Sequence, residues 1–277
     1  MTAASDRLRA AGIPQPEADL DARLLAREVL GWDAARYLAS SLETPPAGFV
    51  EHYAALTARR EQREPVAYIL GRQEFWGRPF IVAPGVLIPR PETELIIETA
   101  LELFVDRGSA LRIADVGTGS GCLALTLAAE FPAASVTATD TSSAAIDVAR
   151  RNARALGLAD RVTFTQTDVL SGVDGTFHLI VSNPPYVPDI DRPALQPEVV
   201  EYEPAKALFG GPDGLAVVRR VVSAAAASLE PSGWLLVEFG LGQADQVAQL
   251  ISEAPGLTMV ALKRDLQGIP RTAVAQH

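Results

Sequence analysis

The residues best suited to chemistry are Asn183-Pro184-Pro185-Tyr186, which follow the apolar run at residues 177–181. Proline has no backbone N–H and fixes φ at about −65°, so strand pairing must end at the two prolines. The Asn183 side chain offers an oxygen acceptor and an NH₂ donor, the Pro184 carbonyl adds an acceptor, and Tyr186 adds a flat ring. Residues 183–186, called the lip from here on, could therefore hold a planar amide or amidine.

A second chemical group follows the apolar strand predicted at 111–116. Asp115 precedes the turn Gly117-Thr118-Gly119-Ser120-Gly121, after which a helix is predicted. Glycines allow a tight turn and let a ligand approach the backbone beside a helix N-terminus. Asp140 ends the next predicted strand, where its carboxylate could accept hydrogen bonds from both hydroxyls of a ribose. These features predict a cofactor that carries adenosine.

The spacing of the glycines indicates which cofactor this is. In the dinucleotide fingerprint the third glycine comes three positions after the second, whereas here the three glycines are evenly spaced, which disfavours NAD. S-adenosylmethionine has no pyrophosphate to cradle, and its amino acid moiety and sulfonium tolerate nearby carboxylates. Asp168 ends the third predicted strand, where an adenine amino group would need an acceptor, and Val169 follows it.

The elements that position these groups alternate between strand and helix, which predicts an α/β fold with a doubly wound sheet. The last two strands have no helix between them, so an antiparallel pair at one sheet edge is expected. A helix is also expected after Pro91. Strands are predicted at 111–116, 135–140, 161–167, 177–182, 232–239, 256–264 and 270–275, and helices between them at 121–130, 142–156, 213–229 and 243–253.

Two segments precede the sheet. Residues 1–72 have helical apolar spacing, with Arg59–Glu64 expected as a solvated helix end, and 73–90 predict a β-hairpin connector. Residues 91–277 form the predicted catalytic domain. The helical domain could simply cap that domain, but a recognition domain for a macromolecular substrate explains it better.

Composition narrows the class of protein. The net charge is −10, with most of the excess acid after residue 80, and aromatic residues make up only 6% of the chain. Both values argue against a protein that binds a long stretch of nucleic acid phosphate backbone. No apolar run reaches the roughly 18 residues of a spanning helix, and no basic stretch followed by an apolar one opens the chain, so a cytoplasmic location is expected. No metal site is predicted.

The sequence resembles class I S-adenosylmethionine-dependent methyltransferases, and more narrowly the HemK/PrmC family of protein-(glutamine-N5) methyltransferases. The resemblance covers nearly the whole chain. Val169 departs from it, because relatives often have an aromatic residue there. The matching residues are Pro65–Tyr68, Glu74–Trp76, Leu87–Glu94, Asp115–Gly121, Asp140, the lip, Tyr202–Pro204, Gly211–Leu215, Arg264–Leu266 and Gly268–Arg271.

The resemblance implies a Rossmann-like sheet of seven strands and a defined reaction. The expected reaction is transfer of a methyl group from S-adenosyl-L-methionine, which becomes S-adenosyl-L-homocysteine, to the glutamine of the Gly-Gly-Gln motif in class 1 peptide chain release factors. Stable nucleic acid binding and membrane binding are not expected. The catalytic motifs leave open a ribosomal protein glutamine, and the lip also occurs in enzymes that methylate N6 of adenine or N2 of guanine.

The resemblance and the residues together give a set of expected site residues. Asn183, Pro184 and Tyr186 are the expected catalytic residues. Substrate contacts are expected from these three and from Pro185, Arg90 and Glu92. Cofactor contacts are expected from Asp115, Gly117, Thr118, Gly119, Ser120, Gly121, Asp140, Asp168, Val169 and Asn183.

Overall fold

The computed structural model describes residues 2–40 and 43–277, which divide into two compact units. The first runs up to Arg72 and also contains Gln196–Tyr202; the second contains Gln73–Leu195 and Glu203–His277. The sequence analysis placed residues 196–202 in the catalytic domain and treated 73–90 as a separate connector, whereas here 196–202 belong to the first unit and 73–90 to the second. The segment 196–202 lies about 125 residues beyond the rest of its unit in the chain.

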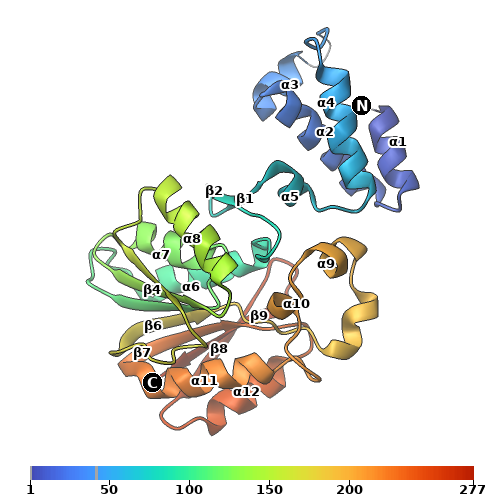
Figure 1. Ribbon diagram of the computed structural model, residues 1–277. Coiled ribbons are helices and arrows are strands. Elements are labelled where there is room, and N and C mark those ends of the chain that lie inside the picture. Colours follow the sequence, from blue (N-terminus) through green and yellow to red (C-terminus); the bar gives the residue numbers. More distant parts are fainter. Residues whose placement is uncertain (1, 41–42) are drawn as a thin grey trace. The chain divides into compact units, whose positions relative to one another are not determined.

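The first unit is helical (Figure 1). Pro16 occupies the first turn of α2, and Gly31 ends that helix in the left-handed conformation at φ 63°. A small apolar core joins α1 to α2 and includes Leu8 and Ala22, with Tyr53 of α4 against it. The helices are α1 (Thr2–Ala10), α2 (Gln15–Leu30), α3 (Ala34–Ser40), α4 (Phe49–Glu61), α5 (Val66–Leu70) and α9 (Pro197–Tyr202).

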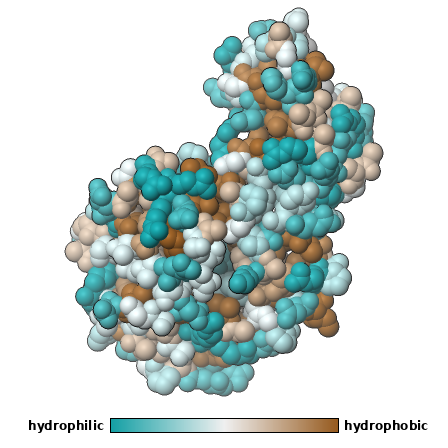
Figure 2. Space-filling model, in the orientation of Figure 1, coloured by the Kyte–Doolittle hydropathy of each residue, from teal (hydrophilic) through white to brown (hydrophobic). Residues whose placement is uncertain are grey.

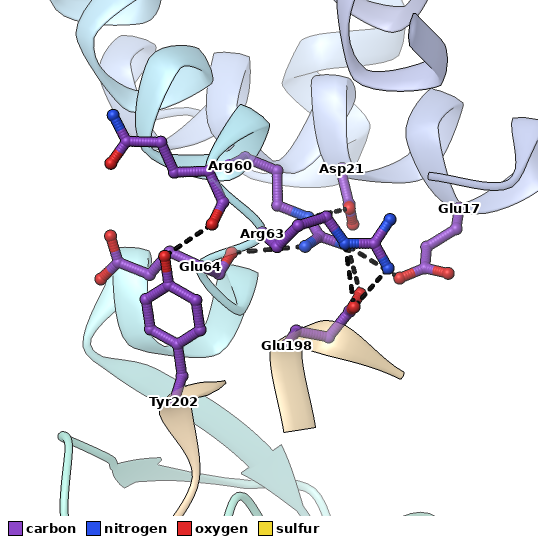
Figure 3. Close-up of polar contacts among 8 residues, drawn as sticks. Glu17, Asp21, Arg60, Arg63, Glu64, Glu198 and Tyr202 are labelled. Carbon is purple, nitrogen blue, oxygen red and sulfur yellow. Dashed lines mark hydrogen bonds and ion pairs between the residues drawn. The ribbon is translucent and has the colours of Figure 1, made fainter. Parts of the chain in front are cut away.

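A buried ionic cluster holds α9 in this unit (Figure 3). The guanidinium of Arg60 is only 2% exposed; it donates to Asp21 at 2.7 Å, to Glu17 at 2.9 Å and to Glu198 of α9 at 3.1 Å. Arg63 also donates to Glu198, at 3.0 Å. The sequence analysis expected Arg60 to lie in a solvated helix end, and this prediction was wrong. Arg60 continues the buried face of α4, one turn after a buried threonine at position 57.

The second unit is built on a seven-stranded sheet of order β5-β4-β3-β6-β7-β9-β8. The first five strands in this order are parallel, and β9 is antiparallel to both of its neighbours. The predicted sheet and its terminal antiparallel pair are therefore confirmed. The last strand in sequence, β9, lies between β7 and β8 in the sheet. The strands are β3 (Arg112–Val116), β4 (Ser135–Asp140), β5 (Val162–Gln166), β6 (Phe177–Ser182), β7 (Leu229–Glu238), β8 (Thr258–Arg264) and β9 (Pro270–Gln276).

Helices cover both faces of the sheet, as Figure 1 shows. Alternate strand residues point to opposite faces, so Leu179 and Val181 of β6 pack toward α6 and α7, while Ile180 packs toward α11 and α12. In the view of Figure 2, hydrophilic and hydrophobic residues are interspersed over this unit's surface, consistent with a sheet that is buried on both sides. The main helices are α6 (Glu94–Leu103), α7 (Cys122–Glu130), α8 (Ser143–Ala155), α11 (Ala216–Ser228) and α12 (Ala244–Glu253), with short turns at η1 (Pro91–Thr93), η2 (Asp189–Ala194) and α10 (Ala205–Leu208).

The predicted hairpin is present as β1 (Arg72–Phe75) and β2 (Arg78–Ile81). It packs into the second unit, because Phe75 and Phe80 are buried in the core beside α6 and α7. The side chain of Asn152 on α8 secures it: the amide accepts from the N–H of Ile81 at 2.7 Å and donates to the Ile81 carbonyl at 3.0 Å. The same amide donates to the carbonyl of Ser120 at 2.8 Å, which fixes the glycine turn relative to the hairpin.

The order of the strands also sets the place of the site. From β3 the chain adds β4 and β5 on one side and then returns to place β6 on the other side. Ligands of open α/β sheets bind at the carboxyl ends of strands where the order reverses in this way. The glycine turn after β3 and the lip after β6 both lie at this position.

Candidate functional site

A cavity of about 740 Å³ opens at the carboxyl ends of β3, β4, β5 and β6. Its volume is in the range of cavities that bind cofactor-sized ligands. The connector also contributes to the wall through Gly85, Val86 and Leu87, which the sequence analysis did not assign to a site. The predicted site residues on the wall are Gly117, Gly119, Asp140, Asp168, Val169, Asn183, Pro184 and Pro185.

The glycine turn presents its backbone to this cavity. Gly119 has φ 56°, a side chain there would meet nothing within 4 Å, and its N–H donates to Asp140 at 3.0 Å. A side chain at Gly121 would instead press on Ala149 of α8 at 3.2 Å. Gly121 therefore allows the helix to pack, whereas Gly119 allows a ligand to approach. Thr118, Ser120 and Gly121 lie off the wall.

Asp115 is fully buried beneath the turn. One carboxylate oxygen accepts from the Thr118 hydroxyl at 2.6 Å and from the N–H of Ala124 at 3.1 Å, while the other oxygen has no partner among the described residues. Burial raises the pKa of this carboxyl to about 7. A buried acceptor without a donor is unfavourable, and a ligand ammonium would supply both a donor and the opposite charge. Asp115 itself is absent from the cavity wall, so a contact with the amino acid moiety of S-adenosylmethionine stays a prediction.

Asp140 stands on the wall with its carboxylate held in place. One oxygen accepts from the N–H of Gly119 at 3.0 Å and the other from the N–H of Ser142 at 2.8 Å. Burial raises the pKa of Asp140, and these backbone hydrogen bonds oppose the shift. Each oxygen keeps capacity for one more donor, which is what two ribose hydroxyls require.

Asp140→Ala is expected to weaken S-adenosylmethionine binding about 10- to 150-fold, because charge-assisted hydrogen bonds worth roughly 1.5–3 kcal/mol are lost. Calorimetric titration of both proteins measures this loss. Asp147→Ala on α8 is the control, since its side chain is 75% exposed and lies outside the cavity wall. Equal affinity in the Asp140 variant and the wild type would refute the ribose assignment.

The third predicted acid is placed differently from the other two. The side chain of Asp168 is 58% exposed and forms an ion pair with Arg220 through one carboxylate oxygen, and its contact with an adenine amino group stays a prediction. Val169 has φ 53°, a left-handed conformation that is unusual for a β-branched residue. Both residues, together with Arg220, line the cavity. This part of the cavity wall is thus formed by an ion pair and an aliphatic side chain.

The lip is connected to two residues that the sequence analysis did not assign to the site. The Asn183 NH₂ donates to the Thr93 hydroxyl at 2.9 Å, and that hydroxyl donates to Glu238 at 2.7 Å. The Tyr186 hydroxyl donates to the other oxygen of Glu238 at 3.1 Å. No hydrogen bond to the Asn183 side-chain oxygen is present in the described part of the chain. The sequence does carry a signal for Glu238, because this acid ends the apolar run 234–237.

The loop after α10 and Gln243, the residue just before α12, support the backbone of the lip. Gln243 donates to the Tyr186 carbonyl at 2.9 Å, and the N–H of Gly210 donates to the Val187 carbonyl at 2.9 Å. A side chain at Gly214 would lie 2.1 Å from the Tyr186 carbonyl oxygen. The lip backbone is therefore fixed by packing that only glycine permits at this position.

Three predicted substrate residues lie off the cavity wall. Tyr186 reaches Glu238 instead, and Arg90 forms an ion pair with the buried Glu203. Glu203 also accepts from the N–H of Ile88 at 3.1 Å, so Arg90 and Glu203 together hold the connector. Glu92 is also absent from the wall. Substrate contacts by these residues stay predictions.

Burial raises the pKa of the Glu238 carboxyl from 4.5 to about 7, and the hydrogen bonds from Thr93 and Tyr186 oppose this only in part. Between these two pH values the folded protein keeps a proton that the unfolded chain has lost, so stability falls as pH rises through about 7. Glu238→Gln should remove this dependence. From pH 5 to pH 8, wild type is expected to lose up to about 3 kcal/mol more unfolding free energy than the variant. Urea unfolding at both pH values tests this, and identical changes in the two proteins would contradict it.

Within residues 2–40 and 43–277, no cluster of three His, Cys, Asp or Glu side chains could hold a metal ion. In the same residues, no helix has the length and apolar character needed to cross a membrane.

Comparison with protein families gives two matches that together span most of the chain. Residues 1–71 match the family described as PrmC N-terminal domain, and residues 93–205 match the methyltransferase small domain. Among solved structures, the fold is similar to a methyltransferase from Pyrococcus furiosus, with TM-score 0.55 and 19% identity over 80% of this chain and 98% of that one. It is also similar to the T. thermophilus 16S rRNA N2 G1207 methyltransferase in complex with AdoMet and guanosine, with TM-score 0.52 and 20% identity over 74% of this chain and 49% of that one. At these identities the structures show the class I methyltransferase fold alone.

Curated relatives are much closer in sequence. The release factor glutamine methyltransferase of Bradyrhizobium diazoefficiens is 43% identical over 272 residues, which cover 98% of this chain and 91% of that protein. The enzyme of the same name from Rhodospirillum rubrum is 44% identical over 271 residues, covering 98% and 82%. With this similarity over nearly the whole chain, the protein belongs to the family of release factor glutamine methyltransferases.

Proposed function

We propose that this protein transfers a methyl group from S-adenosyl-L-methionine to the side-chain amide nitrogen of the glutamine in the Gly-Gly-Gln motif of class 1 release factors. The observation that carries the proposal is the state of Asn183 on the cavity wall: its NH₂ is already bonded to Thr93, while its oxygen has no partner among the described residues. An unpaired amide oxygen is the group needed to accept from a substrate NH₂.

Of the residues proposed to hold the cofactor, Asp140, Gly117 and Gly119 line the cavity, and Asp115 is buried beneath the glycine turn. Asp140 would bind the ribose, Asp115 the ammonium, and the backbone at Gly117 and Gly119 would lie against the bound molecule. The bound cofactor supplies a methyl group carried on a positively charged sulfur. All further steps of the proposal depend on groups of the protein and the substrate.

The substrate nitrogen is a poor nucleophile, because its lone pair is delocalised into the neighbouring carbonyl. Asn183 and the carbonyl of Pro184 would each accept one N–H of the glutamine amide, and thereby direct the nitrogen toward the methyl group. Such positioning lowers a barrier by roughly 7–11 kcal/mol in favourable cases. Both acceptors also stabilise the positive charge that develops on nitrogen.

No side chain is assigned as a general base. The nitrogen loses its positive charge by giving up a proton, and an alkylated amide is acidic enough to release that proton to water. Asn183 and Pro184 are neutral acceptors, so they accept hydrogen bonds from the N–H groups of the substrate amide without taking its proton.

The N-terminal residues 1–72 would provide the docking surface for the intact release factor. The net charge of −10 and the few aromatic residues favour a protein substrate over a nucleic acid. Docking predicts a higher kcat/KM for the intact factor than for a short Gly-Gly-Gln peptide, because the peptide cannot reach a surface outside the catalytic cavity. Equal values would leave this domain without a role in recognition.

The decisive test is methyl transfer from labelled cofactor into purified release factor, ribosomal protein and DNA in parallel. Label is expected in the release factor, on the glutamine of the Gly-Gly-Gln motif when the peptide is sequenced by mass spectrometry. A release factor with that glutamine replaced by alanine is the matched control. Label found only in DNA, or only in the ribosomal protein, would refute the proposed substrate.

A further inference from the structure

Two buried side chains, Thr93 and Glu238, link Asn183 of the lip to the end of the central sheet. Thr93 lies in η1 just before α6, and Glu238 is the last residue of β7; each is 1% exposed. Asn183 follows β6 and bonds to Thr93 at 2.9 Å, and Thr93 bonds to Glu238 at 2.7 Å. Three separate elements of the second unit therefore meet in one hydrogen-bonded chain.

The direction of each hydrogen bond follows from the chemistry of the groups. In its ionised form the Glu238 carboxylate only accepts hydrogen bonds, so Thr93 then gives its single hydroxyl hydrogen to Glu238. The Thr93 oxygen can then only accept, and it takes the N–H of Asn183. This leaves the Asn183 oxygen as the free end of the amide.

We propose that Thr93 and Glu238 are positioning residues for methyl transfer, because together they fix which end of the Asn183 amide is offered to the substrate. The proposal rests on the function proposed above, and it assigns a role to two buried residues that are not part of the cavity wall. If the amide turned over, its NH₂ would meet the substrate NH₂, and two donors would then face one another.

Tyr186 completes the arrangement from the other side. Its hydroxyl donates to the second oxygen of Glu238 at 3.1 Å, so both ends of the lip are attached to the same carboxylate. Glu238 thereby sets the side-chain orientation of Asn183 through Thr93 and of Tyr186 directly. One buried acid is sufficient to organise the lip because it presents two acceptor oxygens in a fixed geometry.

The charge of Glu238 is balanced by groups from several elements. Glu92 in η1 raises its pKa, while Arg271 of β9 and the hydroxyls of Thr93 and Tyr186 lower it. Burial is the main cause that raises the pKa of the Cys122 thiol at the start of α7, and the charges of Asp115 and Glu238 add to the rise. Protonation of Glu238 would turn one acceptor into a donor and remove the constraint on Thr93. Activity should therefore decrease as pH falls through the range in which Glu238 gains its proton.

The first test replaces the Thr93 hydroxyl. Thr93→Val keeps the shape but removes the acceptor for Asn183, and it is expected to lower kcat about 10- to 100-fold, the scale typical of residues that orient a ligand-contacting group. Cofactor affinity should stay within about threefold. Thr93→Ser should restore most of the rate, because serine keeps the hydroxyl.

Thr99→Val is the matched control. Thr99 lies in α6, is 1% exposed and donates to the Leu95 carbonyl at 2.7 Å, so this change also removes one buried threonine hydroxyl, but outside the site. Its kcat should equal that of the wild type. If Thr93→Val and Thr99→Val have the same kcat, the proposed role of Thr93 is wrong.

The second test is the dependence of kcat on pH. Glu238→Gln cannot ionise, so the acid side of its profile should lack one ionisation that wild type shows near pH 7. A purely structural role for Glu238 would leave the shape of the profile unchanged, and superimposable profiles would overturn the inference. Wild type must first label the release factor glutamine. If it does not, the proposed function fails and this inference falls with it, whereas a labelled glutamine with unaffected variants defeats the inference alone.

Discussion

Replacing Asn183 with alanine is expected to lower kcat for glutamine methylation by about 10²–10³, the scale seen when one preorganised electrostatic contact is removed. The alanine variant retains the cavity wall but loses the oxygen that would accept from the substrate NH₂. Cofactor affinity should stay within a few fold, because Asp140 and the glycine turn are unaffected. Single-turnover kinetics with a Gly-Gly-Gln peptide, together with calorimetric cofactor titration, would separate the two quantities.

Asn183→Asp is the sharper variant. A carboxylate still accepts from the substrate and attracts developing positive charge, but it has no NH₂ to donate to Thr93. The aspartate variant is therefore expected to recover part of the activity lost in the alanine variant. Wild-type rates in both variants would reduce Asn183 to a turn residue and remove the main support for the proposed mechanism.

The fold could be predicted closely because its signals are local. Short apolar runs, separated by helical spacing, mark every strand of the seven-stranded sheet within a few residues. The largest boundary difference is at β7, which begins at Leu229 rather than 232. There Ser232 adopts φ 65° and the pairing with β6 shifts register, which the sequence does not signal.

The site was predictable only where its residues are close in sequence to a strand end. Asp140 and Asn183 reach the cavity because each follows a parallel strand near the point where the sheet order reverses. Thr93 and Glu238 are 145 positions apart, and only the assembled sheet brings them together. The ion pair between Asp168 and Arg220 could not be predicted from the sequence either, because Arg220 lies in a helix much later in the chain.

The helical unit illustrates why charged residues are difficult to place from sequence. The run Arg59–Glu64 contains only polar residues, so a solvated helix end was the natural prediction. Yet Arg60 follows Tyr53 and Thr57 at helical spacing and is therefore on the buried face of α4. Its acidic partner Glu198 lies 138 residues away, and no local pattern could identify it.

Arg60→Met is expected to cost about 3–5 kcal/mol of unfolding free energy, because it leaves the buried carboxylates of Asp21 and Glu198 without their shared counter-ion (Figure 3). Arg59→Met is the matched control: it removes the same charge one position away, where the guanidinium is 44% exposed and pairs with Glu64. An exposed pair contributes at most about 1 kcal/mol, so this variant should unfold almost like wild type. Urea unfolding gives both values, and amide hydrogen exchange should show faster exchange in α9 only for Arg60→Met, since Glu198 is then held by a single arginine. Equal stability of the two variants would mean that the cluster fills space without holding α9 in place.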